Sequence, residues 1–113
     1  MTKKISIAID AMGGDNSPDK VIEGIKYFLS KNNSNDDFML NVFGKTEEIK
    51  IKLKKYNIES DKINLIHSSK IVSDKEKPLT AVKNSKNTSM WDCIQHQLQG
   101  KSDISLSAGN TGV

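Results

Sequence analysis

Apolar and polar residues alternate at the start of the chain, where Ile5, Ile7 and Ile9 recur at every second position of Lys3–Ile9. A period of two predicts a β-strand, and Ala8 between the isoleucines favours a strand buried on both faces. A helical pattern follows Ser17-Pro18, which resembles an N-cap with proline at the first helical position. Its apolar positions recur at the spacing of one helix face: Val21, Ile22, Ile25, Phe28 and Leu29.

Three further strands are expected along the chain. Phe38–Phe43 is apolar and ends at Gly44, Ile63–His67 follows Asp61, and Asp103–Leu106 comes last. Polar clusters separate these runs from the elements around them, as is typical of surface loops.

Two more helices are expected between these strands. The first extends from a cap at Thr46 to about Tyr56, with Ile49 and Leu53 also facing inward. The second begins at the capping cluster Asn87-Thr88-Ser89 and stops at Gly100. Its inner face is expected to carry Met90, Trp91, Ile94 and Leu98. Pro78 is expected to open a short helical turn through Val82.

The alternation of strands and helices predicts an α/β fold, with a doubly wound, mainly parallel sheet and helices on both faces. Residues 1–113 are expected to form part of a single domain. In such sheets ligands bind beyond the carboxyl ends of the strands. Two glycine-rich loops directly follow strands, so both are expected at that edge.

Composition narrows the functions that the chain can have. All 17 Lys+Arg residues are lysine, and only 5% of residues are aromatic. The chain therefore lacks arginine for recognising bases and has few aromatic rings for stacking on them, which disfavours nucleic-acid binding. One cysteine and two isolated histidines disfavour a structural metal site. No apolar run approaches the roughly 18 residues of a membrane helix, and we expect a cytoplasmic protein.

The first loop, Asp10–Asp15, contains the pair Gly13-Gly14. Glycine lets backbone amides approach a ligand closely, and successive amides can form an anion-binding nest. The following helix would add its positive N-terminal end. Asp10 and Asp15 would orient the loop, bind a cation or contact a polar substrate. The alternative, a tight turn with aspartates as caps, remains open on composition alone.

The second loop runs from Ser107 to Gly112, and Gly109 and Gly112 frame Asn110 and Thr111. Hydroxyl and amide groups beside flexible backbone can bind phosphate oxygens or an acyl carbonyl. A plain turn is again the alternative, although three polar side chains exceed what a turn requires.

Other polar side chains carry weaker signals. Lys86 and Ser89 precede or begin a helix, where an anion would relieve the unfavourable lysine charge, but a solvated lysine is the simpler interpretation. Cys93 is expected to be a small buried thiol rather than a nucleophile. His67 and His96 are expected to be structural or exposed.

Together these segments resemble the bacterial PlsX family of phosphate acyltransferases (acyl-ACP:phosphate acyltransferases). The first signature is Asp-Ala-Met-Gly-Gly-Asp at residues 10–15, with Pro18 and Gly24 downstream, and the second is Ser-Ala-Gly-Asn-Thr-Gly at residues 107–112. Residues 78–90 are similar to the segment between them. Lys83 stands where the family usually has arginine, Thr88 where it has serine and Val113 where it has alanine.

The resemblance implies an N-terminal portion of an α/β enzyme of the isocitrate dehydrogenase type. It would transfer a fatty acyl group from acyl carrier protein to inorganic phosphate for phospholipid synthesis, without a cofactor or metal. Family members are homodimers, and their acyl tunnel and peripheral membrane contacts would lie beyond Val113. Ser107, Asn110 and Thr111 would carry the catalytic role. The phosphate would be held by or near Asp10, Gly13, Gly14, Asp15, Lys86, Ser89, Gly109 and Gly112.

Three rival interpretations remain. The chain would be a catalytically inactive fragment of that enzyme, a piece of a nucleotide- or metal-dependent dehydrogenase of related fold, or a binding module with a lysine-rich surface. The absence of a dinucleotide fingerprint argues against the dehydrogenase.

Overall fold

The computed structural model describes residues 4–14, 16–31, 37–68 and 88–107. The strands are β1 (Ile5–Asp10), β2 (Phe38–Gly44), β3 (Ile63–His67) and β4 (Ile104–Leu106). The helices are α1 (Asp19–Lys31), α2 (Thr46–Lys55) and α4 (Ser89–Leu98). The short turn expected between Pro78 and Val82 lies outside the described residues.

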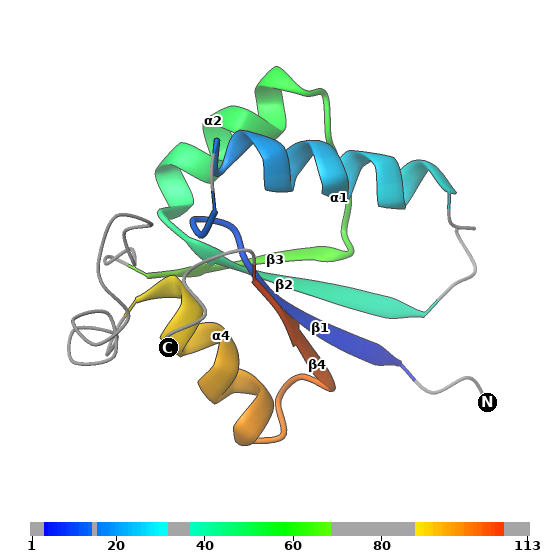
Figure 1. The fold of residues 1–113 in the computed structure, drawn as a ribbon. Helices are drawn as coiled ribbons and strands as arrows, with labels where there is room; N and C mark the ends of the chain where they lie inside the picture. Colours follow the sequence, from blue (N-terminus) through cyan, green and yellow to red (C-terminus); the bar gives the residue numbers. More distant parts are fainter. Residues whose placement is uncertain (1–3, 15, 32–36, 69–87, 108–113) are drawn as a thin grey trace.

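The four described strands form one sheet in the order β3-β2-β1-β4, and every neighbouring pair is parallel. Helices α1 and α2 lie on one face of the sheet and α4 lies on the other (Figure 1). The predicted α/β fold with a parallel sheet is therefore confirmed.

The order of the strands reverses direction at β1. From β1 the chain moves outward to β2 and β3, and it then returns to place β4 on the other side of β1. In parallel α/β sheets such a reversal opens a crevice at the carboxyl ends of the two strands concerned. Both glycine-rich loops follow the strands at this point, one after β1 and one after β4.

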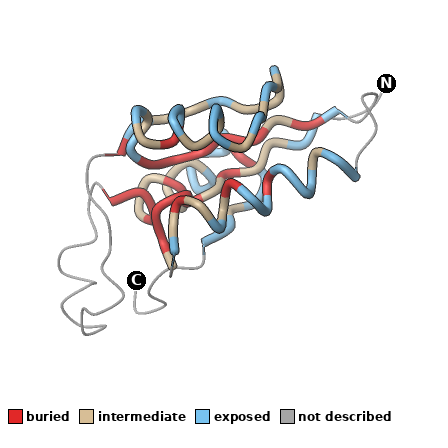
Figure 2. The backbone as a smooth tube through the Cα atoms, turned by 90° about the horizontal axis from the view of Figure 1, so that it is seen from above, coloured by how far each residue is buried: buried red, intermediate tan, exposed pale blue. Residues whose placement is uncertain are grey.

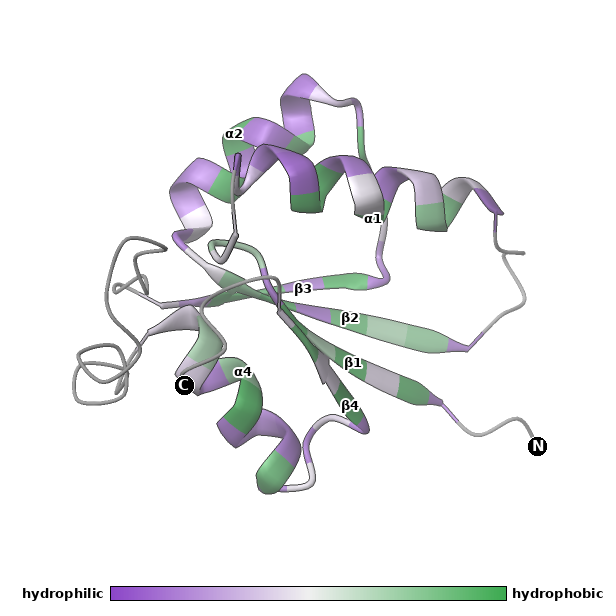
Figure 3. Cartoon of the chain, viewed as in Figure 1, coloured by the Kyte–Doolittle hydropathy of each residue, from purple (hydrophilic) through white to green (hydrophobic). Residues whose placement is uncertain are grey.

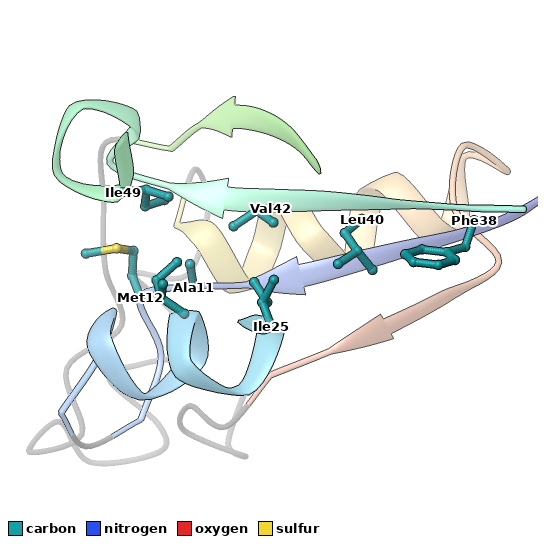
Figure 4. Close-up of a cluster of buried hydrophobic side chains, with 8 residues drawn as sticks. Ala11, Met12, Ile25, Phe38, Leu40, Val42 and Ile49 are labelled. Carbon is teal, nitrogen blue, oxygen red and sulfur yellow. The ribbon is translucent and has the colours of Figure 1, made fainter. Parts of the chain in front are cut away.

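The main core fills the space between the sheet and helices α1 and α2 (Figure 4). The period of two in β2 turns Phe38, Leu40 and Val42 to this side, where they meet Ile22 and Ile25 of α1. Buried residues are concentrated along the strands and the inner sides of the helices (Figure 2), and the outer surfaces of α1 and α2 are mostly hydrophilic (Figure 3). The apolar faces of α1 and α2 are buried against the sheet, and this burial stabilises the observed arrangement.

The opposite face of the sheet is more polar. Ala8, Phe43 and Cys93 form a small cluster beneath α4. Beside it, the amide nitrogen of Asn41 donates to Ser6 Oγ at 2.7 Å and to Ser102 Oγ at 3.1 Å. These bonds satisfy a buried asparagine in the middle of a strand, which would otherwise be destabilising.

Strand β1 is less buried than the sequence predicts. Ile5 is 49% exposed, and Ile7 and Ile9 are only partly buried. The reason is that the described chain does not cover the face that β1 and β4 present on the α1 side.

The helix starts differ in part from the sequence expectations. Helix α1 begins at Asp19, after the left-handed residue Asn16 (φ 60°), and the Ser17 hydroxyl donates to the Gly13 carbonyl. Helix α2 is preceded by Lys45 as its N-cap, so the predicted cap at Thr46 is wrong. Lys45 adopts the extended conformation of a cap, and the Thr46 hydroxyl lies 3.3 Å from His67 Nδ1.

Helix α4 has the predicted cap, and its inner face agrees with the prediction only in part, at Met90. Thr88 Oγ1 accepts a hydrogen bond from the Trp91 amide at 3.1 Å. The buried residues are Ser89, Met90 and Cys93, whereas Leu98 is 73% exposed. The polar network and the Asp10 carboxylate select this face, because they lie on the part of the sheet that α4 covers.

The end of α4 agrees with the expected stop at Gly100. The amide of Gly100 (φ 77°) donates to the Gln97 carbonyl, and the Lys101 amide donates to the His96 carbonyl, both at 3.0 Å. This pair of bonds is the Schellman motif, in which glycine relieves the strain of a left-handed residue.

Candidate functional site

Asp10 lies at the carboxyl end of β1 and is only 2% exposed. Its Oδ1 atom accepts hydrogen bonds from the backbone amides of Met12 and Gly13, each at 3.1 Å. A short acceptor followed by glycines favours this tight turn, because the carboxylate substitutes for a backbone partner. The first glycine-rich loop is thus folded around its own leading aspartate.

The same carboxylate also binds two serines from distant parts of the chain. Ser89 Oγ donates to Asp10 Oδ1 at 2.5 Å, and Ser107 Oγ donates to Asp10 Oδ2 at 2.7 Å. Hydrogen bonds to a carboxylate are among the stronger ones in proteins. One buried side chain therefore joins the first loop, the start of α4 and the residue that follows β4.

Sheet register and helix capping place these serines. Leu106 of β4 is paired with Ile9 of β1, so Ser107 emerges beside Asp10. The cap at Thr88 fixes the first turn of α4, which starts at Ser89 and points its positive N-terminal end toward the same carboxylate. Ser89 is buried, whereas Ser107 is exposed at the edge of the sheet.

The side chain of Met12 anchors the first loop in the core. Met12 is 6% exposed and packs with Ile49 of α2 (Figure 4). A Cβ atom added at Gly44 would lie 2.7 Å from Met12 Cγ and 2.8 Å from Ile49 Cδ1, so a glycine is needed where β2 passes this contact. Gly14 is half-buried with φ 85°, a conformation that glycine adopts without strain.

Comparison with known proteins identifies the family. Residues 5–113 match the family model described as fatty acid synthesis protein. The phosphate acyltransferase of Pelagibacter ubique is 44% identical over 112 residues, which are 99% of this chain and 32% of that protein. The phosphate acyltransferase of Clostridium kluyveri is 36% identical over 106 residues, 94% of this chain and 30% of that protein. The chain belongs to the PlsX family of phosphate acyltransferases.

A third relative gives the same picture. The phosphate acyltransferase of Streptococcus uberis is 37% identical over 106 residues, 94% of this chain and 30% of that protein. The chain thus spans about a third of the length of these curated relatives. The family indicated by the two loop signatures is confirmed.

The structure brings five of the predicted PlsX site residues to one place: Asp10, Gly13, Gly14, Ser89 and Ser107. The other predicted site residues lie outside the described residues, so their positions stay predictions: Asp15, Lys86, Gly109, Asn110, Thr111 and Gly112.

The remaining reactive side chains have other surroundings. Burial raises the pKa of the Cys93 thiol to about 12, which keeps it protonated, as expected of a structural cysteine. Burial, and then the charge of Lys101, lowers the pKa of His96, whose Nδ1 shares a 2.6 Å hydrogen bond with Ser102 Oγ. His67 is exposed at the end of β3.

Two structural contacts near the site were not expected from the sequence. Ser68 follows β3 and donates to Asp92 Oδ2 of α4 at 2.6 Å, which ties a third strand end to the helix that presents Ser89. The sequence gives Met12 no role beyond that of a loop residue, yet its side chain packs in the hydrophobic core. An apolar residue inside an otherwise polar loop was the available signal for Met12, whereas nothing in the sequence pairs Ser68 with Asp92.

The residues that the structure describes contain neither a metal-binding cluster nor a membrane-spanning helix. No group of three or more His, Cys, Asp or Glu side chains in that part of the chain is arranged to hold a metal ion. None of its helices has the length and apolar character that would be needed to cross a membrane.

Proposed function

We propose that this chain carries the phosphate-binding loops of an enzyme that transfers a fatty acyl group from acyl carrier protein to inorganic phosphate. The observation that supports this most is the Asp10 carboxylate, which joins the first signature loop to Ser107, the first residue of the second signature, at the strand reversal. The relatives named phosphate acyltransferase supply the reaction class.

In the proposed reaction a phosphate oxygen attacks the thioester carbonyl carbon. A carbon–oxygen bond forms, the carbon–sulfur bond breaks, and the sulfur of the carrier protein leaves as a thiolate that takes up the proton lost by the hydrogen phosphate. No nucleophile from the protein is required, because phosphate is itself the nucleophile. The protein must position a dianion and stabilise the carbonyl oxygen as its negative charge grows.

Asp10 is assigned a positioning role in this reaction. Its carboxylate is buried and accepts four hydrogen bonds, so it is directed at the protein rather than at a substrate. A second anion in direct contact would also be repelled. Because the Gly13 amide donates to Asp10, we assign Gly13 to bracing the loop and Gly14, with Asp15 as a further organising residue, to the phosphate side.

The second loop is assigned the contacts with the reacting groups. Asn110 and Thr111 would bind phosphate oxygens or the acyl carbonyl, while Gly109 and Gly112 let the backbone approach them. Ser107 would link this loop to Asp10 through its hydroxyl, which donates to Oδ2 at 2.7 Å. Lys86 would add positive charge near the start of α4, where Ser89 is tied to the same carboxylate.

The whole enzyme is proposed to act as a cytoplasmic homodimer, with acyl carrier protein and inorganic phosphate as its partners. These properties concern the longer protein. For the 113-residue chain alone we expect little or no turnover, because it spans about a third of its relatives.

A chimaera tests the proposal, with these 113 residues replacing the matching stretch of the Pelagibacter ubique enzyme. Asn110→Ala and Thr111→Ala should each raise the KM for phosphate by about tenfold or more, as expected for the loss of a hydrogen bond to a charged group. Thr46→Ala, on α2, is the matched control and should leave that KM unchanged.

The chain alone provides a second test. Adding inorganic phosphate should shift the backbone amide resonances of Gly14 and Ser107, and chloride at equal ionic strength should not. Unchanged phosphate kinetics in both loop variants, together with no phosphate response of the chain, would exclude the proposed role of these loops.

A further inference from the structure

A groove of about 390 Å³ lies between α1 and β4, on the face of the sheet that α1 partly covers. We call it the α1–β4 groove. Its floor is formed by Ile7, Ile9 and Leu106, and its wall by Val21, Ile25 and Phe28. Most of its lining is apolar, and among the described residues the polar ones that line it are Asp10 and Ser107, which are joined by a hydrogen bond.

Exposed apolar residues extend this surface along β4. Leu106 is 52% exposed and Ile104 is 45% exposed, and both point to the α1 side because they are paired with Ile9 and Ile7 of β1. Parallel sheets in α/β proteins are covered by helices on both faces. Here α2 and α1 lie on this face (Figure 1), and among the described elements no helix covers the groove over β1 and β4.

Gly24 marks the place where a further helix can approach α1. It lies within α1 and lines the groove, and a Cβ atom added there would meet nothing within 4 Å. A glycine inside a helix costs about 1 kcal/mol relative to alanine. A small residue at a helix contact lets two helix axes come close, within the usual packing distance of about 8–10 Å.

We propose that the α1–β4 groove binds an α-helix that is supplied by the polypeptide that the longer family members have beyond this stretch. The length of the relatives supports this occupant, because about two-thirds of each lies outside the matched region. The helix packs its apolar face on Ile9 and Leu106 and crosses α1 at Gly24. One end of it then lies beside Asp10 and Ser107.

A helix bound in this groove would make the surroundings of Asp10 and Ser107 depend on the rest of the protein. Burial of the groove removes water from one side of the Asp10–Ser107 hydrogen bond, which strengthens an interaction with a carboxylate. The helix therefore completes the surroundings of the proposed phosphate site, and to that extent the consequence rests on the proposed function. The binding of the helix in the groove does not rest on the proposed function, because it depends only on the packing of apolar side chains.

The test compares one substitution in two proteins. In the 113-residue chain, Gly24→Leu should keep or raise the melting temperature, because leucine favours a helix and the space is open. In the Pelagibacter chimaera described above, the same change should lower it by about 3 °C or more, because the added side chain overpacks a filled groove. Lys20→Leu, also on α1 and exposed, should behave alike in both proteins.

A second measurement does not need the chimaera to fold. The chain alone should bind an apolar fluorescent dye at the groove, and Gly24→Leu should reduce this binding where Lys20→Leu does not. The remaining polypeptide of the Pelagibacter enzyme, added in trans, should displace the dye. Failure of that polypeptide to displace the dye would overturn the proposal.

Two other occupants give different results, and each would overturn the proposal. If a fatty acyl chain fills the groove, Gly24→Leu leaves the melting temperature of the chimaera unchanged and shifts its preference toward shorter acyl chains. If a second copy fills it, the chain alone is a dimer that Gly24→Leu disperses. None of these readouts requires phosphate binding, so this inference and the proposed function can fail separately.

Discussion

At the scale of single residues, Asp10 shows how one carboxylate can organise a site without contacting a substrate. Four donors from three segments converge on it, and two of them are backbone amides of its own loop. Asp10 and Ser89 are both buried, so the Ser89 hydroxyl would find little water to replace this acceptor. The fold of the first loop and the positions of Ser89 and Ser107 therefore depend on this acceptor.

Asp10→Asn should disturb this arrangement although it keeps the shape of the side chain. An amide nitrogen in place of one carboxylate oxygen sets a donor against donors, so we expect the free energy of unfolding to fall by about 1–3 kcal/mol. Chemical denaturation measures this change. The phosphate response of the Gly14 amide should be lost as well.

Asp61→Asn is the matched control, because Asp61 is exposed in the turn before β3. Its effect should stay within about 0.5 kcal/mol. Equal stability of the two variants would show that Asp10 does not brace the loops.

Cys93 gives a second prediction at the residue scale. With its pKa raised from 9.0 to about 12 by burial, very little thiolate exists at pH 8. Since the thiolate is the reactive form, alkylation of the folded chain by iodoacetamide should be at least about a hundredfold slower than that of the urea-unfolded chain. Labelling at the same rate in both states would contradict the buried position.

At the scale of elements, the two threonines once expected to cap helices provide a matched pair. Thr88→Ala removes the bond from the Trp91 amide to Oγ1 and should lower the free energy of unfolding by about 0.5–2 kcal/mol. Thr46→Ala should cost less, because the N-cap of α2 is Lys45 and has no side-chain cap bond. Thermal unfolding of both variants measures the difference, and an equal or larger loss for Thr46→Ala would contradict these caps.

These threonines also show what the sequence can predict about the elements. Periodicity predicted β3 over Ile63–His67 as observed, and it placed the start of α1 and both ends of α2 within one or two residues. The inner face of α4 was predicted only in part, because Met90 is buried as expected whereas Leu98, which fits an apolar stripe in isolation, is exposed. Which face is buried was decided by Asp10 and Asn41 on the sheet, and those partners are remote in sequence.

The candidate site was predictable only in part for a similar reason. Loops rich in glycine after strands indicated this edge, and the parallel pairing of β1 with β4 brings Ser107 beside Asp10 there. The distribution of hydrogen bonds was not predictable, since Ser89 and Ser107 are 79 and 97 positions from Asp10. Local patterns carry no signal for contacts of that separation.

At the scale of the whole molecule, a small polar and charged cluster joins helix α1 to the end of helix α2. Asp19 of α1 accepts from Tyr56 Oη at 3.0 Å and lies 3.1 Å from Lys52 Nζ. The hydrogen bond with Lys52 is the main cause that lowers the pKa of Asp19. The hydrogen bond to Asp19 is the main cause that raises the pKa of Tyr56 from 10.0 to about 12.

The raised pKa of Tyr56 predicts how alkali affects the packing of the two helices. A group whose pKa is higher in the folded state contributes stability that is present below its unfolded value and is lost as the pH rises. The contribution of Tyr56 should therefore be complete below pH 10 and disappear between about pH 10 and pH 12. Tyrosinate absorbance should show one late transition, and Asp19→Asn should move it to lower pH. An unmoved transition would separate Tyr56 from Asp19.

The strand order also sets the sequence of events when the chain is made. Synthesis proceeds from the N-terminus, and domains begin to fold as they emerge. Strands β1, β2 and β3 with their two helices are complete by His67, so this half can assemble early from local connections. Strand β4 arrives almost forty residues later and must dock on β1 from the other side. The Ser107 hydroxyl can reach Asp10 only after that docking, so the carboxylate gains its partners in the order of synthesis, with the amides of its own loop first, Ser89 next and Ser107 last.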